Sequence, residues 1–299
     1  MIYTLTLNPA IDYDVFLDKL EIGEINKINT ANIRAGGKGI NVSIVLNNLG
    51  IKSIALGYIA GFTGEYIKND LENMNIKTDF LHLNSGMNRI NTNINDKLNE
   101  TCVSGTPINV SYDDIEKLKD KLRKLKKDDI LVMSGSIPNG LNDDIYLELS
   151  KVVDKDVKIV LDANGDILLK NIYNNYLIKP NIHELERAFN VKIKDNDQIY
   201  NICQYFLDRN VKNIIVSLGS KGAVHITKEG FKYIKSPSGE YINSIGAGDS
   251  MVAGFIAKEN LEFAVACGSA TAYSIGLASS EKIYSIYADI CLTSNLDSF

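Results

Sequence analysis

The sequence predicts an α/β fold in which a mostly parallel central sheet is covered by helices on both faces and carries a small second sheet. One observation is the alternation of short apolar runs with amphipathic stretches at helical spacing, which is typical of parallel sheets. The other is a pair of segments in which polar and apolar residues alternate, as in strands with one face in solvent. The 299 residues are therefore predicted to form one large three-layer domain with an accessory sheet.

The main sheet is predicted from a series of apolar runs. The opening run MIYTLTLNPAID gives a strand that ends at the turn Asn8-Pro9, and GINVSIVLNNLG gives a helix that Gly50 stops. Helix-like stretches such as 111–127 and 195–210 separate the later runs. Ligands of such sheets collect at the carboxyl ends of the strands. The later strand-like runs span 129–135, 157–164, 176–181 and 213–219.

Residues 12–34 and 86–110 are the two alternating segments, as in NRINTNINDKLNETCV. They predict a small sheet that projects from the main domain, with ordinary surface hairpins as the alternative.

Composition excludes several classes of protein. A net charge of −5 and a pI near 5.4 argue against a nucleic-acid or anionic-membrane partner. No apolar run is long enough to cross a bilayer, and no signal peptide is evident, so we expect a cytoplasmic protein. The four widely spaced cysteines are expected to be reduced, mostly buried thiols: Cys102, Cys203, Cys267 and Cys291.

NSIGAGDSMVAGFI, near the C-terminal end, places Asp249 on a glycine hinge at the start of a predicted helix. Gly246 and Gly248 let consecutive amides converge, and the positive end of the helix dipole favours an anion there. In one interpretation Asp249 only caps the helix. In the other it orients a hydroxyl and accepts its proton beside an anion held by the amides, as phosphoryl transfer requires. The dipole is expected to keep this carboxylate ionised.

Three other motifs combine small or polar residues at element ends. AGGKGIN at 35–41 is a glycine loop with one lysine, either a tight turn or a site for sugar hydroxyls and an anion. KPNIHEL at 179–185 sets Asn181 and Glu184 three apart, either as a helix cap with its partner or as oxygen ligands for Mg²⁺. SLGSKGA at 217–223 is either a phosphate cradle or a β-turn. P-loop and dinucleotide fingerprints are absent.

Taken in order, these motifs resemble the ribokinase/PfkB family of sugar kinases across essentially the whole chain. GGKGIN matches the N-terminal signature of that family, and SIGAGDSMVAGF matches its C-terminal one. TLTLNPAID, the lysine in AGGKGINVS, the Arg-Ile-Asn of NRINTNI and ACGSATAYS resemble the branch that acts on sugar phosphates. The resemblance implies a ribokinase-like α/β/α sandwich with a β-sheet lid, ATP and Mg²⁺ as cofactors, and a homodimer that clasps through the lids.

The resemblance also implies a reaction, the transfer of the γ-phosphoryl group of ATP to O6 of D-fructose 1-phosphate. Tagatose 6-phosphate is the alternative substrate, and a neutral-sugar or nucleoside kinase and a non-catalytic sensor are further alternatives. Asp249 is implied as the catalytic base, with Gly246, Ala247 and Gly248 as the anion hole. The implied substrate-binding residues are Asp12, Gly36, Gly37, Lys38, Asn41, Arg89 and Asp249, of which Lys38 and Arg89 hold the sugar's phosphate.

For the nucleotide, the resemblance implies contacts from Gly248 and from the segment around SLGSKG. Asn181 and Glu184 are implied to position Mg²⁺ and its waters. Two features depart from the family pattern: Asn93 stands where this branch commonly has a lysine, and the connection after the catalytic signature is short, which leaves the adenine contacts open. The implied nucleotide-binding residues are Lys179, Ser217, Leu218, Gly219, Ser220, Lys221, Gly222 and Gly248.

Overall fold

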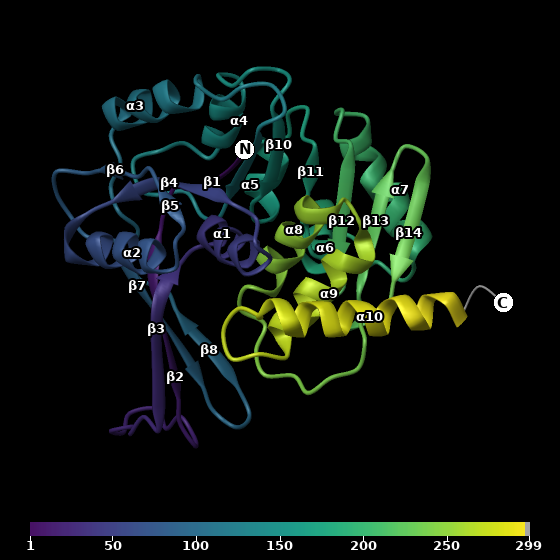
Figure 1. The fold of residues 1–299 in the computed structure, drawn as a ribbon, viewed down its shortest axis with the longest axis horizontal. Helices are drawn as coiled ribbons and strands as arrows, with labels where there is room; N and C mark the ends of the chain where they lie inside the picture. The colour runs from purple at the N-terminus through teal and green to yellow at the C-terminus, as the bar shows by residue number, and fades with distance from the viewer. Residues whose placement is uncertain (297–299) are drawn as a thin grey trace.

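A ten-stranded sheet forms the centre of the structure, a computed structural model that describes residues 1–296 (Figure 1). The strand order is β14-β13-β12-β11-β10-β9-β1-β4-β5, and β6 also pairs with β4. Pairing is parallel from β12 through β5, while β13 and β14 add an antiparallel edge. The strands are β1 (Ile2–Thr6), β4 (Ser53–Ile59), β5 (Lys77–Thr78), β6 (Leu81–His82), β9 (Ile130–Ser134), β10 (Lys158–Asp162), β11 (Leu177–Ile178), β12 (Asn213–Ser217), β13 (Ala223–Thr227) and β14 (Gly230–Ile234).

Helices cover both faces of this sheet, which confirms the predicted three layers. Alternate side chains of β9 show the division, because Leu131 and Met133 enter the core with α3 to α7, while Val132 enters the core with α1, α8, α9 and α10. A third cluster packs α2 against α1. The helices are α1 (Lys38–Asn48), α2 (Gly61–Asn73), α3 (Tyr112–Leu122), α4 (Ile145–Ser150), α5 (Gly165–Lys170), α6 (Ile182–Phe189), α7 (Asn196–Leu207), α8 (Ala247–Lys258), α9 (Leu261–Ala272) and α10 (Ser280–Leu296).

The register aligns the carboxyl ends of the central strands. Thr6 at the end of β1 lies opposite both Gly57 of β4 and Ser134 of β9. Ser134 in turn lies opposite Asp162, the last residue of β10. Polar side chains that follow these strands therefore meet at one edge of the sheet.

The small sheet projects from the main body (Figure 1) and has the order β3-β2-β7-β8. Its strands are β2 (Ala10–Phe16), β3 (Thr30–Gly36), β7 (Arg89–Asn95) and β8 (Glu100–Val103). The parallel pairing of β2 with β7 joins the two predicted segments into one sheet, so the alternative of separate surface hairpins is wrong. The strands at 10–16 and 30–36 extend two residues beyond each end of the predicted segment 12–34, toward the main body.

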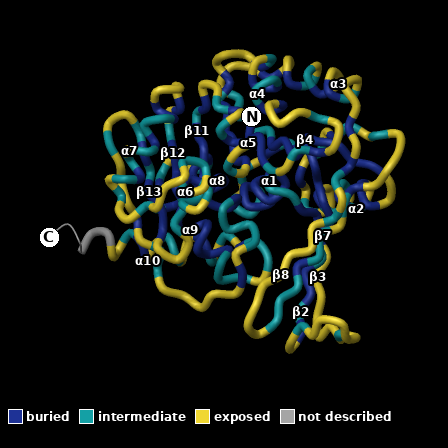
Figure 2. The backbone as a smooth tube through the Cα atoms, turned by 180° about the vertical axis from the view of Figure 1, so that it is seen from behind, coloured by how far each residue is buried: buried dark blue, intermediate teal, exposed yellow. Residues whose placement is uncertain are grey.

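In the small sheet, strand β2 is mostly buried, whereas the connection from β2 to β3 is mostly exposed (Figure 2). Asp12, Asp14 and Arg34 are all at most 9% exposed. By contrast, Ile22 and Ile25 in the β2–β3 connection are 95% and 94% exposed. Polar residues are thus buried where the small sheet meets the main body, and apolar ones are exposed at its periphery.

All four cysteines are free, and Cys203 and Cys267 are buried as expected, whereas Cys102 is exposed on β8. No helix within the described part of the chain is long and apolar enough to span a membrane.

Candidate functional site

A cavity of about 1210 Å³ opens at the carboxyl edge of the main sheet, where the small sheet covers it. It brings together all four motifs singled out in the sequence, although Gly36, Lys221 and Glu184 do not line it. Gly36 packs directly against Asp12, which does line the cavity. A Cβ placed on Gly36 would be only 2.3 Å from the Asp12 carboxylate. The predicted residues that line the cavity are Asp12, Gly37, Lys38, Asn41, Arg89, Lys179, Asn181, Ser217, Leu218, Gly219, Ser220, Gly222, Gly246, Ala247, Gly248 and Asp249.

Asp249 lies in the first turn of α8, and its side chain points toward the cavity rather than capping the helix. The residue before α8 is Gly246, in the left-handed region at φ 78°, which favours glycine. No side chain caps the helix there; the Asp249 carboxylate instead accepts a hydrogen bond from Asn41 Nδ2 at 2.7 Å. The capping interpretation is therefore wrong. The first-turn amides of α8 have no partners within the helix, although the Ala247 amide donates to the Ser244 carbonyl at 3.2 Å.

The pKa of Asp249 is raised to about 6, which differs from the lowering expected from the helix dipole. Burial is the largest cause, and repulsion from Asp162 adds to it. Lys38, the Asn41 hydrogen bond and Lys179 act in the opposite direction but do not outweigh burial. The carboxyl is still mostly ionised at neutral pH, and it is a stronger base than a solvent-exposed aspartate.

Asp162 is a site residue that the sequence interpretation missed. It is 2% exposed, and its Oδ1 lies 3.3 Å from Lys38 Nζ and 3.6 Å from Lys179 Nζ. Burial alone would raise its pKa, but the two lysines hold the pKa below its usual value. The sequence does contain a signal for Asp162, because this residue directly follows the apolar run of β10 and therefore lies at the carboxyl edge of the sheet.

Lys38 lies with the two carboxylates. Its Nζ donates to Asp162 and, at 3.3 Å, to Asn164 Oδ1. Burial alone would lower the pKa of Lys38, but Asp162, Asp249 and Glu184 together raise it. This lysine therefore remains a cation at the centre of the cavity.

Arg89, at the start of β7, lines the part of the cavity below the small sheet. Burial lowers the pKa of its guanidinium, against the attraction of Asp12. Within residues 1–296, its buried Nε has no hydrogen-bond partner. A buried guanidinium nitrogen is costly to leave unpaired, and here it belongs to a side chain that lines the cavity.

Arg34 is the second residue that the sequence interpretation missed. Its guanidinium is buried among Asp12, Asp14 and Asn41, at 3.2 Å from an oxygen of each. Asn93, which stands at the position of the expected lysine, donates to Asp14 at 2.7 Å. The alternation in the small sheet predicts that one face is buried, but nothing in that pattern indicates which charged side chains pair on it.

Asn181 and Glu184 form a capping box at the start of α6. Asn181 Oδ1 accepts from the Glu184 amide at 2.8 Å, and Glu184 Oε2 accepts from the Asn181 amide at 2.9 Å. The helix-cap interpretation of this motif is therefore confirmed, and the capping box holds both side chains in fixed positions. Within the described residues no group of three or more His, Cys, Asp or Glu side chains is arranged to hold a metal.

The SLGSKG segment turns sharply at the end of β12. Gly219–Lys221 form a 3₁₀ turn, and Gly222 follows at φ 103°. Lys221 does not line the cavity, and its carbonyl accepts from the Tyr233 hydroxyl. The connection from α8 to α9 is short, as expected from the sequence. Further residues on this side of the cavity that the sequence interpretation did not predict are Ser236, Gly239, Val265, Gly268, Ser269, Ala272 and Tyr273.

The buried charge of Asp249 has a consequence for stability. A carboxyl whose folded pKa of about 6 exceeds its ordinary 3.8 destabilises the fold above pH 6 and has no such effect below about pH 4. Asp249→Asn should therefore raise the free energy of unfolding at pH 7.5, by up to about 3 kcal/mol, and by less at pH 5. Urea denaturation at the two pH values measures this. An unchanged or lower stability at pH 7.5 would contradict it.

Comparisons with known proteins show the family of this chain. The model of the pfkB family of carbohydrate kinases matches residues 3–283. A 1-phosphofructokinase of Borreliella burgdorferi is 38% identical over 97% of this chain and 97% of its own. A D-tagatose-1-phosphate kinase of Bacillus licheniformis is 35% identical, covering 98% of this chain and 99% of its own. A tagatose-6-phosphate kinase of Staphylococcus epidermidis is 34% identical, covering 85% and 84%.

Among solved structures, phosphofructokinase-2 of Escherichia coli in complex with substrates and products has a TM-score of 0.91 and 26% identity, covering 97% of this chain and 99% of its own. A ribokinase of Arabidopsis thaliana shares the fold at a TM-score of 0.74 and 21% identity. The family match covers far more than half of the chain, and the sequence relatives cover most of it. The chain belongs to the PfkB family of carbohydrate kinases.

Proposed function

We propose that this kinase transfers the γ-phosphoryl group of ATP to O6 of D-fructose 1-phosphate and forms D-fructose 1,6-bisphosphate. The observation that carries the proposal is the Arg89 guanidinium, which lines the cavity and has an unpartnered buried Nε, because such a cation favours an anion in a cavity that is also lined by the buried Asp249 carboxylate. Two phosphorylated ligands, one at each end of such a cavity, account for this arrangement better than one. The 38% identity with a 1-phosphofructokinase supports the choice of fructose 1-phosphate.

In this proposal Asp249 orients the acceptor hydroxyl and takes its proton, since it is the buried carboxylate nearest the anion position. The amides at 246–248 hold the transferring oxygens. Lys38, which lies by Asp162 and is drawn electrostatically to Asp249, stabilises the charge on the phosphoryl group. Asp12 and Asn41, with the backbone of Gly36 and Gly37, take sugar hydroxyls.

Lys179 and the turn at 217–222 take the nucleotide phosphates. The residues present fit Mg²⁺ held through water, because the capping box fixes the Asn181 and Glu184 side chains beside the cavity. The ion would neutralise phosphate charge there.

In this proposal residues 1–299 form one kinase unit, and the small sheet is a lid that excludes water.

The substrate is tested by comparing kcat/KM, with ATP and Mg²⁺, for fructose 1-phosphate, tagatose 1-phosphate, tagatose 6-phosphate, fructose 6-phosphate and free fructose. We expect fructose 1-phosphate to be preferred. Preference for a tagatose phosphate would leave the proposed mechanism intact and would change the proposed substrate.

Arg89→Ala should raise KM for the sugar phosphate by at least ~10-fold, since a charge-assisted hydrogen bond is lost. Arg123→Ala, at the exposed residue that follows α3, is the matched control. Indifference to Arg89→Ala would favour a neutral substrate.

The proton acceptor is tested separately. Asp249→Asn should lower kcat by at least ~10²-fold, because a positioned general base contributes about that much. In the wild-type enzyme kcat should fall as the pH drops through about 6, where Asp249 becomes protonated. A steady-state pH profile from 5 to 8 measures both. Near-normal turnover of the variant would remove Asp249 from this role.

We also propose that the small sheets of two chains pack together. The proposal is supported by Ile22 and Ile25 in the β2–β3 connection and Leu98 in the β7–β8 connection, which are at least 86% exposed, because large apolar side chains exposed on one small sheet favour a protein–protein contact. Ile25→Asp with Leu98→Asp should weaken self-association at least ~10-fold, as the loss of central apolar contacts does. Light scattering after gel filtration measures this, with Phe62→Asp on α2 as the control. A wild-type monomer at all concentrations would contradict the proposal.

A further inference from the structure

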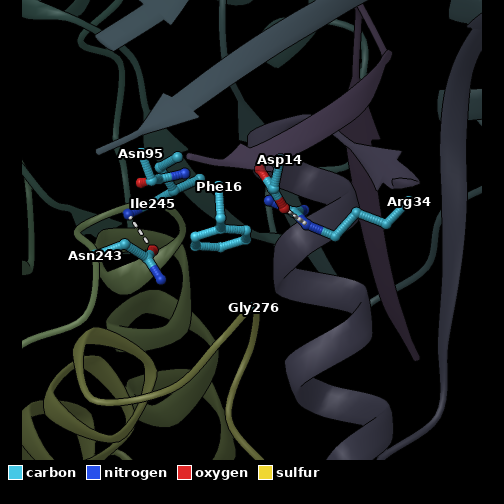
Figure 3. A pocket seen from close by; sticks show the side chains of 7 residues that line it. All are labelled: Asp14, Phe16, Arg34, Asn95, Asn243, Ile245 and Gly276. Atoms are coloured by element: carbon cyan, nitrogen blue, oxygen red, sulfur yellow. Dashed lines mark hydrogen bonds and ion pairs between the residues drawn. The ribbon is translucent and has the colours of Figure 1, made fainter. Parts of the chain in front are cut away.

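Arg34 of β3 is a buried cation that the proposed function does not use. It is 9% exposed, and each of its three guanidinium nitrogens has a different partner. Nη2 lies 3.2 Å from Asp12 Oδ2, Nε donates to Asp14 Oδ2 at 3.2 Å, and Nη1 donates to Asn41 Oδ1 at 3.2 Å. Figure 3 shows Arg34 reaching across to Asp14 beside a small cavity under the lid.

The Asn41 side-chain amide lies between the Arg34 guanidinium, which can only donate hydrogen bonds, and the Asp249 carboxylate, which accepts them. The Arg34 guanidinium has no acceptor atom, so it requires an oxygen from Asn41. The Asp249 carboxylate, when ionised, has no donor, so it requires the NH₂ group. In the observed orientation both are satisfied, with Nδ2 donating to Asp249 Oδ2 at 2.7 Å. A rotated amide would place two donors together at one end and two acceptors at the other.

Without Arg34 this orientation would depend on Asp249 alone. The groups that face Asp249 come from several elements: Asp162 of β10 repels its charge, while Lys38 of α1, Lys179 after β11 and the Asn41 amide stabilise it. If the hydrogen bond from Asn41 were lost, burial and Asp162 would still raise the pKa of Asp249, and only the two lysines would act to lower it. The ionised form of the carboxylate would then be less favoured.

Asp12 and Asp14 fix the other side of the guanidinium. Asn91 donates to Asp12 Oδ1 at 2.9 Å, and Asn93 donates to Asp14 Oδ1 at 2.7 Å. Residues of β2 and β7 thus hold Arg34, and Arg34 holds a residue of α1. The chain of contacts runs from the small sheet to the first turn of α8.

We propose that Arg34 is a positioning residue: it holds the Asn41 amide in the orientation that donates to Asp249, and so connects the small sheet to the proton acceptor. The inference rests on the proposed role of Asp249. Arg34 itself does not line the large cavity that Asp249 and Asn41 line.

The test uses Arg34→Lys, which keeps the buried charge but cannot supply three donors in one plane. We expect the acid limb of the kcat profile to move up by about one pH unit, because a hydrogen bond to the ionised carboxylate is lost, with KM for ATP unchanged. Asp14→Asn is the matched control, since it removes one ion pair of Arg34 and leaves the bond to Asn41. Its acid limb should stay with that of the wild type.

A second readout does not depend on turnover. Carbon-13 NMR of labelled aspartate gives the pKa of Asp249 in the free protein, and this pKa should rise in Arg34→Lys and not in Asp14→Asn. An unmoved pKa and acid limb in Arg34→Lys would overturn the inference while leaving the kinase activity in place. If the wild-type protein phosphorylates no sugar phosphate, the proposed function is wrong. The NMR comparison of the Asp249 pKa between the variants would still decide the role of Arg34.

Folding is checked by thermal melting. If Arg34→Lys does not fold, the double variant Arg34→Met with Asp14→Asn replaces a buried ion pair with neutral groups and is measured in the same way. If neither folds while Asp14→Asn does, Arg34 has a structural role only, and the inference is wrong.

Discussion

Two buried carboxylates that repel each other, Asp162 and Asp249, set the electrostatics of the whole site. Neither is stable as an isolated buried charge. Lys38 and Lys179 contact Asp162, and the same lysines also favour the charge on Asp249. The result is asymmetric, because Asp162 is held ionised while Asp249 keeps a pKa near neutrality. Environments that separate two carboxyl pKa values in this way give one group a fixed charge and the other a proton to exchange.

The fold supplies this arrangement through strand register. Asp162 ends β10, Asp249 lies in the first turn of α8 and Lys38 starts α1, so all three lie near element ends on one edge of the sheet. The small sheet then covers the edge with a polar face whose own charges, Asp12, Asp14 and Arg34, are already paired. Among the charged side chains of this sheet, Arg89, which lines the cavity, differs from these three, because its Nε has no partner within the described residues.

The sequence alone predicted the layers, the parallel sheet and many of the residues that line the cavity, because those depend on short-range patterns. The glycines around Asp249 and the run before Asn8 mark element ends directly. It did not predict β4, β13 or β14, nor the contacts of Asp162 and Arg34. A pairing such as that of Arg34 with Asn41 joins different elements across the fold, and which donor faces which acceptor depends on tertiary geometry that local patterns do not encode.

The direction of the pKa shift at Asp249 shows why a local argument was insufficient. The dipole of α8 favours the charged carboxylate, but burial and Asp162 act more strongly in the opposite direction. Under the proposed function the nucleotide adds further negative charge beside this group, which raises its pKa again unless a cation arrives with it. A divalent ion, which Asn181 and Glu184 would position through water, would offset that charge. The ionisation of the proton acceptor is then coupled to binding of the complete metal–nucleotide complex, since the nucleotide alone would favour the protonated, inactive carboxyl.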